Sequence, residues 1–144
     1  MKIINLGGFY MSIYGVTKGT KFEGQIDKNG KGEEKGAGMY AGLAYLAKER
    51  GLDEISEILL KIAADEMRHA GIYAVLNGHT NEDILGFLKK IAPAESNAFE
   101  SLNQFASQMR GIGLEDAAKQ IDVIAEDERR HGELLAKLVK ESAK

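Results

Sequence analysis

The stretch Asp-Glu-Met-Arg-His at residues 65–69 returns as Asp-Glu-Arg-Arg-His at residues 127–131. Each copy places a glutamate three residues before a histidine. On an α-helix this spacing puts both side chains on one face, about one turn apart. Two such helices, each joined by a helix that carries one further glutamate, form the ligand set of a carboxylate-bridged two-metal site. The doubled stretch therefore predicts a helical fold around two metal ions.

The doubled stretch belongs to a longer internal repeat. Residues 33–76 align with residues 95–138 without a gap. A repeat of this kind predicts an all-α fold made of two helical hairpins related by a pseudo-twofold axis. Twelve aligned pairs are identical: Glu33/Glu95, Ala44/Ala106, Gly51/Gly113, Leu52/Leu114, Ile62/Ile124, Ala63/Ala125, Asp65/Asp127, Glu66/Glu128, Arg68/Arg130, His69/His131, Ala74/Ala136 and Leu76/Leu138.

Hydrophobic periodicity places the two helices of the first repeat. The first helix begins weakly near Thr20, because glycines crowd its first half and each disfavours a helix by about 1 kcal/mol. A start near Gly32 is the alternative. The second helix is expected over residues 53–76. We expect residues 1–19 to be an irregular N-terminal segment and residues 20–144 to form one domain.

The second repeat has a less regular beginning. Thr80 and Asp83 resemble a capping box that opens a short apolar stretch. Pro93 ends or kinks that stretch and favours a new helix just before Glu95. This third helix is expected to end near Arg110, and the fourth to span residues 115–140. His79 stands in the polar loop before this region and is expected to be solvated.

The composition excludes several classes of function. The chain has 144 residues, a net charge of −3 and no cysteine. The absence of cysteine excludes disulfides, thiolate zinc sites and iron–sulfur clusters. Because charges of both signs are interspersed, we expect neither a nucleic-acid nor a membrane partner. We identify no signal peptide or transmembrane segment, and a cytoplasmic location is expected.

The repeat predicts where the four glutamates meet. Glu33 and Glu95 precede the turn glycine of their repeat by 18 residues, and Glu66 and Glu128 follow it by 15. At about 1.5 Å per residue, the two arms of each hairpin are about 27 and 22 Å long. Both glutamates of a hairpin then lie within about one turn of the same level.

Four buried carboxylates require cations, because each charge loses its solvation. Carboxylate oxygens with one imidazole per metal suit iron, with manganese or a mixed pair as the alternative. Glu66 and Glu128 are assigned as bridging ligands. The terminal ligands are Glu33 and His69 on one metal and Glu95 and His131 on the other.

Residues beside the ligands have predicted supporting roles. Asp65 and Asp127 are expected to accept a hydrogen bond from the histidine of the other hairpin, and Arg68 and Arg130 to offset their charge. Two interpretations of Tyr40 stay open. It is either a hydrogen-bond donor or redox-active group near the metals, or a buried core tyrosine.

The whole constellation resembles the ferritin-like di-iron carboxylate proteins, and most closely the rubrerythrins. The likeness covers about residues 18–141, including Lys18-Gly19-Thr20-Lys21, Gly32-Glu33 and both Glu-x-x-His motifs. It implies a ferritin-like four-helix bundle, two iron ions and the reduction of hydrogen peroxide. In such a bundle the third helix begins at the end opposite to where the second finishes.

The sequence departs from the rubrerythrin pattern in three ways. Rubrerythrins usually carry a rubredoxin domain with four cysteines, so electrons here would come from a separate, rubredoxin-like donor protein. They also have a further glutamate where this chain has Ala98, which makes the six-ligand set closer to that of bacterioferritin. The connection between the second and third helices is shorter in this chain than in rubrerythrins. Either a crossover helix within residues 77–93 makes the return, or a second chain completes the bundle as a domain-swapped homodimer.

These observations predict a di-iron peroxidase of rubrerythrin type. Two alternatives stay open. One is a ferroxidase or oxidase that reacts with dioxygen, because the Asp-Glu-x-Arg-His motif is also typical of oxygen-activating di-iron enzymes. The other is a non-catalytic iron-binding protein.

Overall fold

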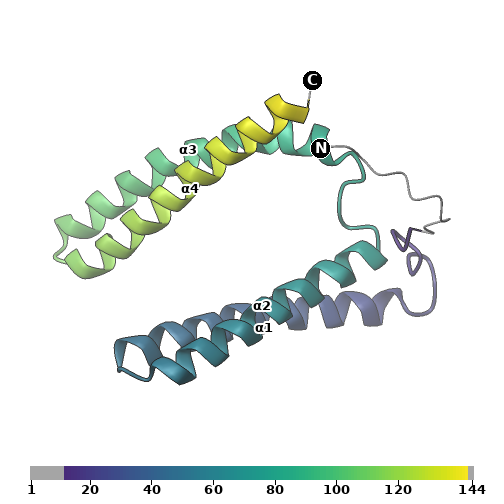
Figure 1. Cartoon of the computed structure of the whole chain (residues 1–144), viewed down its shortest axis with the longest axis horizontal. Helices are drawn as coiled ribbons and strands as arrows, with labels where there is room; N and C mark the ends of the chain where they lie inside the picture. Colours follow the sequence, from purple (N-terminus) through teal and green to yellow (C-terminus); the bar gives the residue numbers. More distant parts are fainter. Residues whose placement is uncertain (1–11, 143–144) are drawn as a thin grey trace. The chain divides into compact units, whose positions relative to one another are not determined.

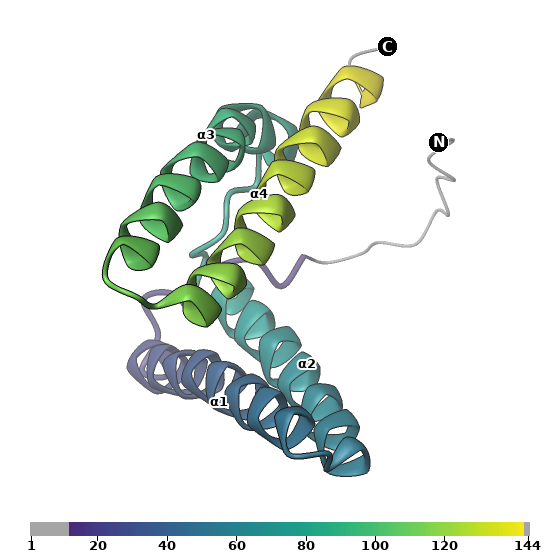
Figure 2. The same ribbon diagram turned by 90° about the vertical axis from the view of Figure 1, so that its left-hand side faces the viewer.

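The fold consists of two helical hairpins. The structure, a computed structural model, describes residues 12–142. Within this range the helices are α1 (Glu23–Glu49), α2 (Asp53–Leu76), α3 (Ile84–Gly111) and α4 (Glu115–Ser142), and there is no strand. Helix α1 pairs with α2, and α3 with α4 (Figure 1, Figure 2). The prediction of an all-α chain built from two hairpins, as in a ferritin-like four-helix bundle, is confirmed.

The two hairpins are separate compact units, Met1–Thr80 and Asn81–Lys144. We call the α1–α2 pair hairpin 1 and the α3–α4 pair hairpin 2, and describe each by itself. None of the four helices is both long enough and apolar enough to span a lipid bilayer.

The same turn closes both hairpins. Gly51 and Gly113 adopt left-handed conformations, with φ of 72° and 82°. The next residue donates its amide back to the helix, Leu52 to the carbonyl of Ala47 at 2.9 Å and Leu114 to that of Met109 at 3.0 Å. This is the Schellman pattern of a helix that ends at glycine. The identity of both glycine–leucine pairs in the repeat thus reflects one backbone geometry.

Small side chains at intervals of seven residues form the contact between the helices of each hairpin. Such a spacing keeps one seam of a helix facing its partner. The Ser56 hydroxyl, which lies in this seam, donates to the carbonyl of Ala44 at 2.8 Å. The buried members of the seam are Ala37 and Ala44 on α1, Ser56, Ala63 and Ala70 on α2, Ala92 and Ala106 on α3, and Ala118, Ala125 and Gly132 on α4.

The structure corrects the expected start of the third helix. Helix α3 begins at Ile84 and runs through Pro93 without a break. Its cap is Asp83, whose carboxylate accepts from the amide of Gly86 at 3.0 Å, so the expected Thr80–Asp83 box is replaced by a simpler cap. Proline inside a helix costs about 3 kcal/mol. Here Ala92 is buried in the seam, so packing on α4 holds the helix together on both sides of Pro93.

The remaining helix boundaries agree closely with expectation. Helix α1 begins at Glu23, which excludes the late start near Gly32. Helix α2 spans the predicted residues 53–76, and α4 extends two residues beyond its predicted end. Seven residues, 77–83, connect α2 to α3, and they contain no crossover helix.

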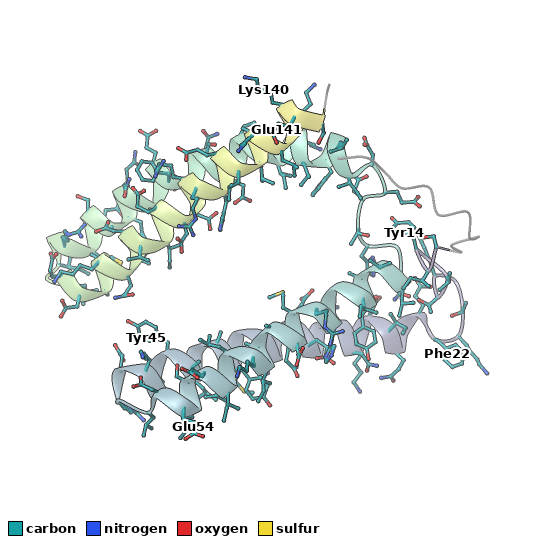
Figure 3. The ribbon with its side chains drawn as sticks, viewed as in Figure 1. Tyr14, Phe22, Tyr45, Glu54, Lys140 and Glu141 are labelled. Carbon is teal, nitrogen blue, oxygen red and sulfur yellow. The ribbon has the colours of Figure 1, made fainter. Side chains whose placement is uncertain are left out.

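A clasp of turns preceding α1 holds the C-terminal end of α2. Residues 12–22 form these turns, and residues 1–11 of the expected irregular segment lie outside the described residues. The amides of Gly15 and Thr17 donate to the carbonyls of Val75 and Leu76 at 2.9 and 3.0 Å. The Tyr14 hydroxyl lies 3.0 Å from the carbonyl of Gly78, and Figure 3 shows its ring beside this end of α2.

Asn77 is the centre of this clasp. Its side chain is fully buried, and its amide nitrogen donates to the carbonyl of Glu23 at 2.9 Å and to Asp27 Oδ1 at 2.6 Å. His79 Nε2 lies 2.7 Å from the same Asp27 oxygen. His79 is therefore exposed, as expected of a loop residue, but it is also held by a carboxylate. The network ties the beginning of α1 to the end of α2.

Candidate metal centre

Hairpin 1 brings its three predicted ligands together. Glu33 from α1 and Glu66 and His69 from α2 each offer a ligating atom within 4.8 Å of the others. All three side chains are half-buried. His69 Nδ1 lies 3.4 Å from Glu33 Oε2, so the imidazole faces the carboxylate of the opposite helix. The similar level of the two glutamates, within about one turn, follows from the lengths of the two arms about Gly51.

Hairpin 2 brings together the equivalent triad of Glu95, Glu128 and His131, again within 4.8 Å. Here the histidine faces its own helix. His131 Nδ1 lies 3.4 Å from Glu128 Oε2 and 3.9 Å from Glu95 Oε2. The two triads therefore have the same composition but orient the imidazole toward different carboxylates.

The paired carboxyls disturb one another in both hairpins. The pKa of Glu66 is raised, first by a hydrogen bond to the Glu33 carboxyl, and then by burial and the charge of Glu33. The pKa of Glu95 is raised in the same way by Glu128. Two carboxylates in close contact repel one another, so one of them holds a proton more tightly. Each hairpin thus presents a negative pair that a cation would neutralise.

The donor set fits the metal expected from the sequence. Each triad supplies carboxylate oxygens and one imidazole nitrogen, which suit iron or manganese. A structural zinc site would more often use thiolates, and the sequence has no cysteine. A single triad has three donors, fewer than an iron or manganese ion usually takes. The fit is therefore to a site that is completed by additional ligands.

The aspartate and arginine of each Asp-Glu-x-Arg-His motif form an exposed ion pair. Arg68 Nη2 lies 3.5 Å from Asp65 Oδ1, and Arg130 Nη2 lies 2.8 Å from Asp127 Oδ1. Each arginine thus forms an ion pair with the aspartate of its own motif. The pairing of each aspartate with the histidine of the other hairpin stays a prediction. Tyr40 is half-buried on α1, two turns beyond the ligand on that helix, and its role also stays a prediction.

Sequence reasoning did not identify two features of hairpin 1. A Cβ atom added to Gly36 would lie 2.5 Å from Glu66 Oε2, so the carboxylate lies directly on this glycine. The Asn77 network was the second omission. The contact of Glu66 with Gly36 left a signal in the sequence, because Gly36 lies three residues after the predicted ligand Glu33. The second left no local signal, because Asn77 and Asp27 are 50 residues apart.

Comparison with known proteins agrees with this geometry. The family model described as Rubrerythrin matches residues 26–93, which include all three ligands of hairpin 1. An uncharacterized protein of Methanocaldococcus jannaschii is 33% identical over 121 residues, covering 84% of this chain and 86% of the relative. Reverse rubrerythrin-1 of Clostridium acetobutylicum is 30% identical over 122 residues, covering 82% of this chain and 67% of the relative. The chain therefore belongs to the rubrerythrin family.

Proposed function

We propose that this protein is a non-haem di-iron oxidoreductase that reduces hydrogen peroxide with electrons from a separate donor protein. The observation that carries the proposal is the presence of two carboxylate–carboxylate–imidazole triads at equivalent positions of the repeat. Membership of the rubrerythrin family supports the di-iron centre. A structural ion pair would not need the same three side chains twice.

In the proposed centre, six side chains hold two iron ions. In this proposal, Glu66 and Glu128 would be the ligands shared by the two ions. When bound in the reduced state, the ions would supply two electrons for cleavage of the O–O bond and positive charge beside the oxygens. The overall reaction consumes two protons and two electrons and releases two water molecules. Glu33 and His69 would hold one ion, and Glu95 and His131 would hold the other.

In this scheme, side chains of the protein would bind the ions and orient the ligands and the oxidant. His69 and His131 each leave one ring nitrogen for a second contact, and Arg68 Nη2 lies 3.3 Å from Nε2 of His69. Tyr40 is proposed to donate a hydrogen bond toward the oxidant. The donor would be a small rubredoxin-like protein, since these residues contain no cysteine for an iron–sulfur centre.

The connection between the hairpins favours a homodimer in which each centre combines hairpin 1 of one chain with hairpin 2 of the other. A parallel arrangement of α2 and α3, as in ferritin-like bundles, requires the chain to return along α2. That helix has 24 residues and is about 36 Å long. The seven connecting residues reach at most about 25 Å. A second copy of the chain would therefore complete the centre.

Anaerobic kinetics test the peroxidase proposal. The iron-loaded protein, reduced by a rubredoxin-like donor, is expected to oxidise the donor continuously when peroxide is added. The Glu66→Ala variant, which lacks one bridging carboxylate, is the control and is expected to lose this turnover. Reaction of the reduced wild type with dioxygen but not with peroxide would indicate an oxidase or ferroxidase. A single turnover without sustained donor consumption would indicate an iron-binding protein.

Subunit mixing tests the exchanged dimer. Glu66→Ala damages only hairpin 1, and Glu128→Ala only hairpin 2. After the two variants are unfolded together and refolded, hairpin exchange would rebuild intact centres at about a quarter of the sites. Restored iron binding in the mixture, absent from either variant alone, is the expected result. If both glutamates of each centre come from one chain, mixing restores nothing.

A further inference from the structure

The carboxylate of Glu66 lies on a glycine that the helix itself does not require. Gly36 is inside α1 and does not have a positive φ, so any residue could adopt its backbone conformation. A Cβ atom at this position would lie 2.5 Å from Glu66 Oε2 and 3.4 Å from Glu66 Cδ. The atoms that it would meet are the end of a flexible side chain rather than backbone. An added methyl group would therefore move the carboxylate and leave the helices in place.

Three other glycines of the same helix have no such contact. A Cβ atom at Gly32, Gly38 or Gly42 would meet no atom within 4 Å. These positions therefore tolerate alanine, whereas position 36 does not without displacing Glu66. Since Gly36 lies one turn after Glu33, the glycine provides the space in which the Glu66 carboxylate approaches the Glu33 carboxylate.

The second hairpin has a side chain at the equivalent position. Gly36 aligns with Ala98 in the repeat. In hairpin 2 the glutamate of α4 lies beside its own histidine, with Glu128 Oε2 at 3.4 Å from His131 Nδ1. In hairpin 1 it is instead the α1 glutamate, Glu33, that lies 3.4 Å from the imidazole. The imidazole therefore contacts a different glutamate in each hairpin, and the two hairpins also differ in having Gly36 or Ala98 one turn after the first glutamate.

We infer that Gly36 is a positioning residue for the metal centre. By lacking a side chain, it seats the Glu66 carboxylate against α1, and so makes the two triads unequal. This inference rests on the two-metal centre proposed above. It predicts that a methyl group at position 36 weakens metal binding without weakening the fold.

Titration of the metal-free, full-length protein with Mn²⁺ alone tests the inference. Free Mn²⁺ is followed by electron paramagnetic resonance, and thermal unfolding of the metal-free protein is measured in parallel. We expect Gly36→Ala to weaken Mn²⁺ binding about tenfold or more, the scale for residues that orient ligands. Its unfolding temperature is expected to equal or exceed that of the wild type, because alanine favours a helix over glycine.

Gly42→Ala is the matched control, since it makes the same substitution in the same helix away from any neighbour. It is expected to change the unfolding temperature like Gly36→Ala and to bind Mn²⁺ like the wild type. Wild-type Mn²⁺ binding by Gly36→Ala would overturn the inference alone. A clear fall in its unfolding temperature, absent from Gly42→Ala, would also overturn it, because Gly36 would then be a packing residue. Failure of the wild type to bind two equivalents would overturn the proposed centre and this inference with it.

Discussion

Hairpin 1 and hairpin 2 carry the same three candidate ligands on the same scaffold, but they differ in the small residues that surround them. In hairpin 1 the glycine of the pair Gly36/Ala98 faces a ligand. In hairpin 2 the glycine of the pair Ala70/Gly132 lies in the helix seam instead. The two halves of the repeat therefore share their candidate ligands and their turn, but the close contact at a glycine lies at a different position in each. Ligand identity alone does not make two half-sites equivalent.

Polar contacts also tie the two helices of each hairpin together, but at different ends. The open end of hairpin 1 is tied by Asn77 and Asp27, which link α1 to α2. In hairpin 2, Arg110 bridges Glu115 and Asp122 near the closed end. A buried asparagine and an exposed ion pair contribute differently, because an exposed pair is worth at most about 1 kcal/mol.

The largest effect is expected from Gly132→Ala, which targets the seam of hairpin 2. An added Cβ atom would lie 2.9 Å from the backbone nitrogen and 3.1 Å from Cα of Ser96. Backbone cannot move aside as a side-chain end can, so the helices must separate, at a cost of about 2–3 kcal/mol. Urea unfolding measures the loss, and hydrogen exchange should locate it in residues 84–142. Ala98→Gly, on the same hairpin, is the control and should cost no more than about 1 kcal/mol.

A smaller effect is expected from Asn77→Ala, which targets hairpin 1. The substitution removes the two hydrogen bonds that the buried side-chain amide donates, to the part-buried carbonyl of Glu23 and to the Asp27 carboxylate, at a cost of about 2 kcal/mol. Faster amide exchange should appear at the start of α1 and the end of α2, and not in hairpin 2. Asn81→Ala removes an exposed asparagine nearby and should change stability by a few tenths of a kcal/mol. Equal stability of the two variants would show that the clasp is not important for the fold.

The smallest effect is expected in the pH dependence of stability, and it involves Asp27. Hydrogen bonds from Asn77, and then from His79, lower the pKa of Asp27 below its usual 3.8. A carboxylate whose pKa is lowered by folding stabilises the protein above its unfolded-state pKa, and this contribution is lost as the pH falls through the folded-state value. Wild type should therefore exceed Asp27→Asn in stability near neutral pH, and the difference should narrow below about pH 4. A difference independent of pH would contradict this account.

Asp122→Asn extends the acid comparison to hairpin 2. Arg110 lowers the pKa of Asp122 in the same direction. Both variants should show the same sign of pH dependence. Hydrogen exchange should assign the change to residues 12–80 for Asp27→Asn and to residues 81–142 for Asp122→Asn. Exchange that rises in both hairpins for either variant would mean that the hairpins do not open independently.

Sequence patterns predicted the features that depend on local spacing. The three-residue interval between Glu66 and His69 places both on one face of a helix whatever surrounds it. Gly51 followed by Leu52 specifies a helix ending through backbone geometry alone. The limits of α2 and the composition of both triads followed from such patterns. The start of α3 did not, because the local preference of Pro93 is overridden when Ala92 packs into the seam.

By itself, then, the sequence determined the four helices, the two turns and the six candidate ligands, because each depends on residues within a few turns of one another. Only the tertiary structure decided how the Glu66 carboxylate meets Gly36 and how Asn77 meets Asp27. These contacts join residues 30 and 50 positions apart, and their geometry depends on the closeness of two packed helices. Helical periodicity shows which face a residue occupies, but only packing determines which atom it touches.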